Sequence, residues 1–270
     1  YESFPAVRIY FDQADEILGY GLKNLMFFGE EEELKRTEIT QPAVFVYSYA
    51  TYKSKEPGIA HGVAGHSLGE LTALVAAEAL DFESGLKLVD ARARAMQQAC
   101  EMTNSTMAAI LGLDDDNVRR ICEDTPGIVV AANFNCPGQV VISGEVSAVE
   151  QANEACKLAG AKRAIMLSVG GAFHSPLMEP AIALFSNAVG KVPFKIPTIP
   201  VFQNVDALPS VEPDEIKRKL LAQLTSSVQW TSIIENMRTN GIEDFVEFGS
   251  KVLGGFVRKI YKEASVTSFE

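Results

Sequence analysis

One serine in this chain stands between two glycines at the spacing of a nucleophile elbow. Gly65, Ser67 and Gly69 form the pattern Gly-x-Ser-x-Gly, in which the chain turns sharply from a strand into a helix and presents the serine hydroxyl above the end of a sheet. The residues before it, 59–64, can run extended, and residues 68–80 are rich in helix formers. We expect both glycines to allow a close approach of the backbone at the turn. The pattern predicts that Ser67 is a nucleophile.

A serine hydroxyl needs a general base within hydrogen-bond reach to become a strong nucleophile. The chain has three histidines. His66 adjoins Ser67, so the two side chains should point apart, and His61 lies on the strand that precedes the turn. His174 lies in the glycine-rich segment 170–176, and loops on a rigid scaffold often carry catalytic groups. His174 is therefore the predicted base.

Polar side chains beside apolar helical faces give further candidates. In the helix predicted near 84–101, Arg94 faces away from the apolar stripe and Arg92 leans toward it. A partly buried guanidinium needs an anionic partner, which is either an internal carboxylate or the carboxylate of a ligand. The pattern leaves both open. From the pattern alone, Gln41 and Gln223 could equally be ordinary cap or helix-surface residues.

The elements around these residues predict an α/β fold with a small inserted domain. Helices and strands alternate before and after the insertion, as in a mainly parallel sheet with helices on its faces. Inside it the predicted order is strand, helix, strand, strand, helix, strand, the ferredoxin-like order. We expect a large α/β-hydrolase-like catalytic domain from residues 1–102 and 171–270, with 103–170 as the ferredoxin-like subdomain.

Periodicity and turn residues give approximate bounds for these elements. In the insertion, strands are expected at 107–113, 128–132, 139–143 and 162–169, and helices at 114–124 and 147–159. In the larger domain, strands are expected at 59–64, 199–204 and 244–248, and helices at 68–80, 84–101, 176–189, 214–224, 231–240 and 249–263.

Composition excludes several classes of protein. The 270 residues are 47% hydrophobic, enough for a full core. A net charge of −11 argues against nucleic-acid binding, which needs a clustered basic face. The four cysteines form no Cys-x-x-Cys pair, so we expect buried free thiols rather than a metal site. With no apolar run of membrane-spanning length and no signal peptide, we expect a cytoplasmic protein that binds no membrane, metal or cofactor.

Taken together, these motifs resemble those of the malonyl-CoA:acyl carrier protein transacylase family, the acyltransferases that load bacterial fatty-acid synthesis. The resemblance covers essentially all of the chain. Its motifs are Thr40-Gln41-Pro42-Ala43, Gly65 to Glu70, Arg92 with Met96-Gln97, Asn133-Phe134-Asn135 with Pro137 to Ile142, Ala172-Phe173-His174-Ser175, Val228-Gln229-Trp230-Thr231 and Glu247-Phe248-Gly249 with Lys251-Val252-Leu253.

The resemblance implies roles at the reacting centre. Ser67 would be the nucleophile and His174 its base, with the backbone carbonyl of Gln223 orienting the imidazole in place of an acid. The backbone N–H of Leu68 would form one half of the oxyanion hole. The implied reaction is a ping-pong transfer of malonyl from malonyl-CoA to the phosphopantetheine thiol of acyl carrier protein through a malonyl-serine ester. We expect a monomer.

The resemblance also implies which residues bind the acyl group. Arg92 would bind the free carboxylate of the malonyl group, and Gln41 matches a glutamine that lines the cleft in this family. Met96 accompanies Arg92 in the family motif and is expected to contact substrate. Phe173 resembles the malonyl rather than the methylmalonyl version of its loop.

One departure from the family leaves other functions open. The family's Gly-Gln-Gly-Ser-Gln segment, which supplies the second oxyanion donor, would lie ahead of Tyr1, and we expect that the chain is truncated rather than degenerate. A serine hydrolase or thioesterase of the α/β-hydrolase type shares the elbow, although it would normally carry an acid between the serine and the histidine. A non-catalytic, carrier-docking pseudoenzyme is the third reading.

Overall fold

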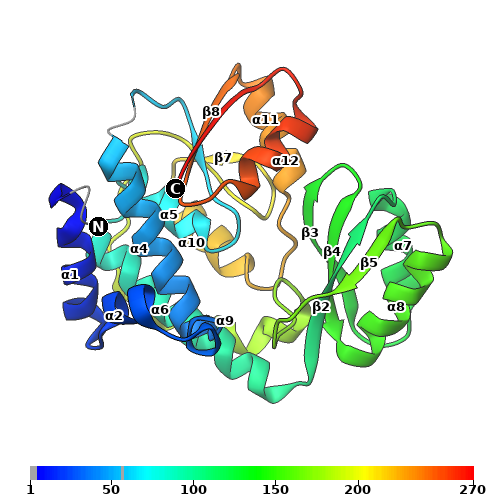
Figure 1. Cartoon of the computed structure of the whole chain (residues 1–270). Helices are drawn as coiled ribbons and strands as arrows, with labels where there is room; N and C mark the ends of the chain where they lie inside the picture. Colours follow the sequence, from blue (N-terminus) through cyan, green and yellow to red (C-terminus); the bar gives the residue numbers. More distant parts are fainter. Residues whose placement is uncertain (1–4, 56–57) are drawn as a thin grey trace.

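Two regions of different construction lie side by side in the computed structural model, which describes residues 5–55 and 58–270 (Figure 1). The larger region is rich in helices and is formed by the first and last parts of the chain. The smaller region, drawn in green, is a four-stranded sheet with two helices against it.

The first part of the larger region ends at a long helix. Its elements are η1 (Pro5–Val7), α1 (Arg8–Leu18), α2 (Leu22–Phe28), α3 (Glu31–Leu34), α4 (Thr37–Lys55), β1 (Val63–Ala64), α5 (Gly69–Ala76) and α6 (Phe82–Met102). Asp81 begins α6, because its side chain accepts a 2.7 Å hydrogen bond from the Ser84 N–H. Gly85 lets α6 approach α5, since a Cβ there would lie 2.4 Å from Val75. This helix carries both candidate arginines.

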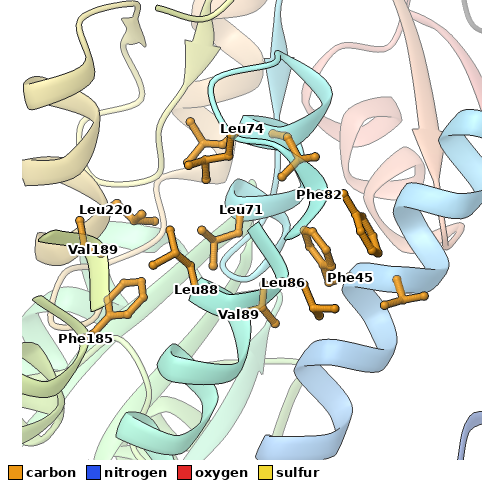
Figure 2. Packing of buried hydrophobic residues seen from close by; sticks show 14 of the residues in the cluster. Phe45, Leu71, Leu74, Phe82, Leu86, Leu88, Val89, Phe185, Val189 and Leu220 are labelled. Atoms are coloured by element: carbon orange, nitrogen blue, oxygen red, sulfur yellow. The ribbon is translucent and has the colours of Figure 1, made fainter. Parts of the chain in front are cut away.

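Helices α4, α5 and α6 share one hydrophobic core with α9 and α10 from the later part of the chain. Figure 2 shows how their buried side chains interlock: Phe45, Leu71, Leu74, Phe82, Leu86, Leu88, Val89, Phe185, Val189 and Leu220. Leu71 and Leu86 are fully buried. This core fixes α5, which begins directly after the elbow.

The smaller region is βαββαβ along the chain: β2 (Ser105–Leu111), α7 (Asp115–Asp124), β3 (Val129–Cys136), β4 (Gln139–Glu145), α8 (Val146–Leu158) and β5 (Arg163–Met166). The strands lie in the order β3-β4-β2-β5, and every neighbouring pair is antiparallel. The predicted order of these elements is therefore the observed order. The prediction for β3 was too short, because the strand continues to Cys136 and its Asn133 forms a bridge with Val228 in the larger region.

The last part of the chain returns to the larger region. It contains η2 (Pro176–Met178), α9 (Glu179–Lys191), β6 (Val201–Phe202), β7 (Pro209–Ser210), α10 (Pro213–Ala222), α11 (Trp230–Thr239), β8 (Asp244–Phe248), α12 (Val252–Ile260) and β9 (Ser265–Phe269). Strand β6 pairs parallel with β1 and antiparallel with β7, and β8 pairs parallel with β9 in a separate sheet.

The sheet of the larger region is smaller than the sequence predicts. Of the predicted strand 59–64, only Val63–Ala64 pairs, and of the predicted strand 199–204 only Val201–Phe202 pairs. Strands β7 and β9 were not predicted, because β7 is two residues long and β9 has a largely polar sequence, Ser-Val-Thr-Ser-Phe. The short β1–β6 pair nevertheless brings the elbow beside the segment that follows β6. No helix in the described part of the chain is long and apolar enough to cross a membrane.

Candidate active site

The turn between β1 and α5 holds Ser67 in a conformation that few residues adopt. Its φ is +52°, in the left-handed region, which costs about 1–3 kcal/mol for a residue other than glycine. A Cβ on Gly65 would lie 1.9 Å from the backbone of Gly69, so Gly65 is required at this position. The backbones of Gly65 and Gly69 thus approach each other closely, but only Gly65 has to lack a side chain, since a Cβ on Gly69 would meet no atom within 4 Å.

Ser67 and His174, which are far apart in the sequence, are in direct contact. Ser67 Oγ lies 2.7 Å from His174 Nε2, and His174 Nδ1 lies 2.9 Å from the backbone oxygen of Gln223. Because a carbonyl oxygen can only accept, Nδ1 carries the proton and Nε2 is left to accept from the serine hydroxyl. His174 is buried and has a φ of +58°. The geometry suits proton transfer from Ser67 to a histidine that is oriented by a carbonyl.

The surroundings of His174 keep its imidazole neutral. Burial and the charge of Arg92 lower its pKa to about 3, although hydrogen bonds with the backbone of Gln223 and Ser226 act in the opposite direction. An imidazole that is neutral at physiological pH has its Nε2 lone pair free to accept a proton. The imidazole of His174 therefore needs no prior deprotonation to accept a proton.

Arg92 is buried and its charge faces neutral oxygens. One Nη donates to Gln41 Oε1 at 2.6 Å, and the other donates to Gln223 Oε1 at 2.9 Å and to Ser67 Oγ at 3.1 Å. Burial lowers the pKa of Arg92 to about 10, so the guanidinium remains charged at neutral pH.

The contacts of Arg92 distinguish between an internal carboxylate and the carboxylate of a ligand as its partner. None of the ion pairs found among the described residues includes Arg92, and its buried Nε has no hydrogen-bond partner. The internal salt bridge is therefore not found, and the arrangement suits an anion that comes from outside. Arg94 faces outward and pairs with Asp90 at 2.9 Å, as its position in the helix predicts.

Three polar residues that sequence reasoning missed hold the elbow. Asn204 Oδ1 accepts a 2.7 Å hydrogen bond from the Ser67 N–H, and its Nδ2 donates to the Gly65 carbonyl at 2.8 Å. The carboxylate of Glu70 accepts from the Asn204 N–H at 2.7 Å and from Gln203 Nε2 at 3.1 Å. All three side chains are fully buried. Two signals in the sequence could have identified them. Glu70 is a carboxylate directly after the elbow on an otherwise apolar helix, and Gln203 and Asn204 are polar residues at the carboxyl end of a predicted strand.

Glu70 is the buried carboxyl group of this network. Its pKa is raised, because burial outweighs the hydrogen bonds from Asn204, Gln203 and Gln223 and the charge of Arg92, which act to lower it. The side chains of Glu70 and Arg92 thus interact through amide groups rather than by direct contact.

The backbone N–H of Leu68, the residue after the serine, has no acceptor within the described part of the chain. The Ser67 N–H, in contrast, already donates to Asn204. Leu68 stands at the start of α5, where unpaired N–H groups and the helix dipole favour negative charge. This N–H is suited to an oxyanion.

The remaining predicted residues lie around this centre. Gln41 is buried in α4, where it reaches Arg92 and also donates from Nε2 to Met96 Sδ at 3.6 Å. Phe173 precedes His174 and packs both against a cluster of the smaller region that includes Met107 and against the core of the larger region, to which Met96 belongs. The structure therefore brings Gln41 and Met96 to Arg92 and places Phe173 between the two regions.

The other two histidines are not in contact with the serine hydroxyl. His66 points away from Ser67, with Nε2 2.8 Å from Asn135 Oδ1 and its ring against Trp230. Burial lowers the pKa of His66. His61 is exposed. In the described part of the chain, no three His, Cys, Asp or Glu side chains are grouped to hold a metal ion.

Comparison with known proteins gives one consistent result. Residues 4–251 match the family model described as the acyl transferase domain. The chain is 43% identical over 267 residues to the malonyl CoA-acyl carrier protein transacylase of Escherichia coli strain K12, with 96% of this chain and 85% of that protein covered. It is 42% identical over 266 residues to the protein of the same name from Bacillus subtilis, with 96% and 84% covered.

Solved structures agree with the sequence relatives. An acyl carrier protein S-malonyltransferase from Vibrio cholerae superposes with a TM-score of 0.95 at 40% identity, covering 100% of this chain and 90% of that one. A malonyl-transacylase in complex with its type II PKS acyl-carrier protein gives a TM-score of 0.95 at 38% identity, covering 99% and 89%.

The lowered pKa of His174 predicts a change in stability with pH. Its pKa is about 3 in the folded protein, against 6.5 for an ordinary histidine, so between these values the unfolded chain binds a proton that the folded chain does not. The lowered pKa of His174 therefore stabilises the folded protein at a pH above the ordinary pKa of histidine, and this contribution is lost as the pH falls below that pKa. Replacing this histidine removes that contribution. As the pH falls from about 6.5 to about 5, the free energy of unfolding should therefore decrease by about 2 kcal/mol less in His174→Asn than in wild type.

Urea unfolding at several pH values measures the difference. His66, whose pKa burial also lowers, contributes its own pH dependence to both proteins, so the comparison isolates His174. The same loss of stability in the two proteins would contradict the buried neutral state of this imidazole.

Proposed function

The chain belongs to the acyl transferase domain family, and on that premise we propose that it transfers a malonyl group from malonyl-CoA to the phosphopantetheine thiol of an acyl carrier protein. One observation carries the proposal: the hydroxyl of Ser67 lies 2.7 Å from a neutral histidine and 3.1 Å from a buried arginine. A serine beside a base can form an acyl ester, and a free cation beside the same serine selects an acyl group with a second carboxylate. The relatives named as malonyl transacylases support this substrate.

The proposed first half-reaction loads the serine. His174 Nε2 takes the proton of Ser67 as Oγ forms a bond with the thioester carbon of malonyl-CoA, and the carbonyl electrons move to the oxygen. The Leu68 N–H donates to that oxyanion. As the carbonyl re-forms, the carbon–sulfur bond breaks and CoA leaves as a thiol with the proton from His174. The product is a malonyl ester of Ser67.

The second half-reaction reverses these steps with another thiol. His174 Nε2 takes the proton of the phosphopantetheine thiol, the sulfur attacks the ester carbonyl, and Ser67 leaves with the proton from His174. The Gln223 carbonyl holds Nδ1–H throughout, so the imidazole keeps its orientation in both halves. A carbonyl stabilises the imidazolium less than a carboxylate would, which suits a base that passes its proton on quickly.

The acyl group is proposed to be selected by charge. The malonyl carboxylate would accept from Arg92, whose neutral partners Gln41 and Gln223 fix the direction of the guanidinium without neutralising it. An acetyl group leaves this buried charge without an anion, and an unpaired buried charge is costly. Met96 and Phe173 are proposed to contact the acyl group from the positions described above.

We also propose the domain assignment that the sequence predicted. Residues 1–102 and 171–270 would form an α/β-hydrolase-like catalytic domain, and residues 103–170 a ferredoxin-like subdomain. The antiparallel order β3-β4-β2-β5 supports the second assignment. The strand–turn–helix arrangement of β1, Ser67 and α5 supports the first.

The proposed ester can be observed directly. After mixing with malonyl-CoA, mass spectrometry of the protein and of its peptides should show a malonyl adduct on Ser67 and none in Ser67→Ala. Adding holo acyl carrier protein should move the malonyl group to the carrier. Release of free malonate at the same rate with and without carrier would instead favour a hydrolase, and failure of the protein to form any adduct or to turn over malonyl-CoA would contradict both readings.

Arg92 is predicted to set the choice of acyl group. Arg92→Ala should lower kcat/KM for malonyl-CoA by about 30-fold to 5,000-fold, because removing one partner of a buried charge pair costs about 2–5 kcal/mol. Activity with acetyl-CoA should rise relative to malonyl-CoA. Arg94→Ala is the matched control, since Arg94 lies on the same helix and faces outward; it should stay within about twofold of wild type. Equal losses with both acyl groups would reduce Arg92 to a structural residue.

A further inference from the structure

The loop that carries His174 rests on the smaller region of the protein. Strands alternate their side chains between two faces, and the two faces of this sheet differ. Ala108, Ile110, Val140 and Ile142 pack with α7 and α8 in one cluster. Met107 and Val141 belong to another cluster on the opposite face, which includes Phe173 of the loop. The sheet therefore has one face for its own helices and one for the loop of the proposed base.

Ser143 is a buried serine that lies among apolar neighbours on the face of the sheet that packs against the loop of His174. Ser143 lies directly across from Met107 in the β2–β4 pair, so both side chains share this face. Ser143 is fully buried, and its hydroxyl donates a 2.7 Å hydrogen bond to the backbone oxygen of Phe173. A second serine on the same face, Ser105, accepts from the Ala172 N–H at 3.1 Å. Two hydroxyls from the smaller region thus hold consecutive residues of the loop.

The bond from Ser143 acts on the geometry of His174 itself. The carbonyl of Phe173 and the N–H of His174 belong to one planar peptide unit. A hydrogen bond that holds the Phe173 oxygen therefore also orients the N–Cα bond of His174. Rotation about this bond defines the φ of His174, which is +58°. Residues are held in this region only when their surroundings determine them. The hydroxyl of Ser143 is one such determinant.

The rest of the loop leaves little room for another arrangement. A Cβ on Gly171 would lie 2.1 Å from Cys100 Sγ of α6, so the loop is packed closely against the larger region on this side. Ser175 Oγ donates to the Ala172 carbonyl at 2.6 Å and closes the loop on itself. The sheet face and helix α6 therefore hold the loop from two sides.

We propose that Ser143 is a positioning residue for the base, through which the smaller region holds His174 Nε2 within reach of Ser67. The residue does not touch the reacting atoms; it acts through the Phe173 carbonyl. Loss of its hydroxyl leaves that carbonyl without this donor in a buried place, and the loop shifts toward a conformation in which His174 is less well aligned. The proposal goes beyond the proposed function, because it concerns the reactivity of Ser67 toward any acyl or phosphoryl donor.

The test uses an alkyl fluorophosphonate as well as malonyl-CoA. With the fluorophosphonate, Ser67 Oγ forms a bond to phosphorus, the phosphorus–fluorine bond breaks, fluoride leaves with the bonding electrons, and His174 Nε2 takes the hydroxyl proton. This reaction needs the base but not Arg92. A wild-type protein that reacts with the fluorophosphonate and not with malonyl-CoA would therefore defeat the proposed function while leaving the role of Ser143 testable.

Ser143→Ala should label with the fluorophosphonate about 10-fold to 100-fold more slowly than wild type, since a misplacement on the order of 1 Å can cost that much. With malonyl-CoA, kcat should fall by a similar factor and KM should change less than kcat, because Gln41 and Arg92 lie in the larger region whereas Phe173 shifts with the loop. Ser143→Thr, which keeps the hydroxyl, should recover most of the labelling rate.

Thr231→Val is the matched control. It removes another bond between the two regions, the 3.1 Å donation from Thr231 Oγ1 to the Phe134 carbonyl, and should label at the wild-type rate. Equal labelling rates for Ser143→Ala, Thr231→Val and wild type would overturn the proposal, as would an equal slowing of the two variants. If Ser143→Ala does not fold, Ser105→Ala carries the test with an expected loss of about threefold, and a wild-type rate in that variant would overturn the proposal.

Discussion

The 2.7 Å contact between Ser67 Oγ and His174 Nε2 is the interaction on which the rest of the site depends. Each partner sits in the left-handed backbone region, so neither position is favoured by its own residue. Residues elsewhere in the fold hold both in this conformation. Asn204 and Glu70 hold the backbone of the elbow, whereas Ser143 and the Gln223 carbonyl hold the histidine. The strain is offset by burial and by these hydrogen bonds with distant parts of the chain.

The electrostatics of the centre follow from the same burial. A neutral imidazole beside a buried guanidinium is favoured, because a second positive charge would have neither water nor an anion to stabilise it. Glu70 is linked to Arg92 only through amide groups, which leaves the guanidinium available to a ligand. Gln223 contacts both His174 and Arg92, since its backbone oxygen orients the imidazole and its side-chain oxygen accepts a hydrogen bond from the guanidinium. In the proposed mechanism, orientation of the base and selection of the acyl group thus depend on one residue.

Sequence could predict the elements that local chemistry determines. The elbow, the helix that carries Arg92 and the order of the smaller region follow from glycine spacing, helical periodicity and strand alternation. Sequence could not decide whether Arg92 pairs internally, because that depends on which acids face it in three dimensions. Asn204 and Ser143 were missed for the same reason. Each is an ordinary polar residue in its own segment and acquires a role only when a distant segment, the elbow for Asn204 and the histidine loop for Ser143, is brought against it.

The proposed reaction requires that Ser67 carry an acyl ester whose second carboxylate is held by Arg92. A crystal structure of the protein after reaction with malonyl-CoA would show this arrangement. We predict density continuous with Ser67 Oγ that ends in a carboxylate paired in bidentate fashion with Arg92, with the carbonyl oxygen of the ester directed at the Leu68 N–H. Density that leaves Ser67 unmodified, or a malonyl carboxylate that points to solvent while Arg92 keeps only its contacts with Gln41 and Gln223, would contradict the proposed roles of Ser67 and Arg92.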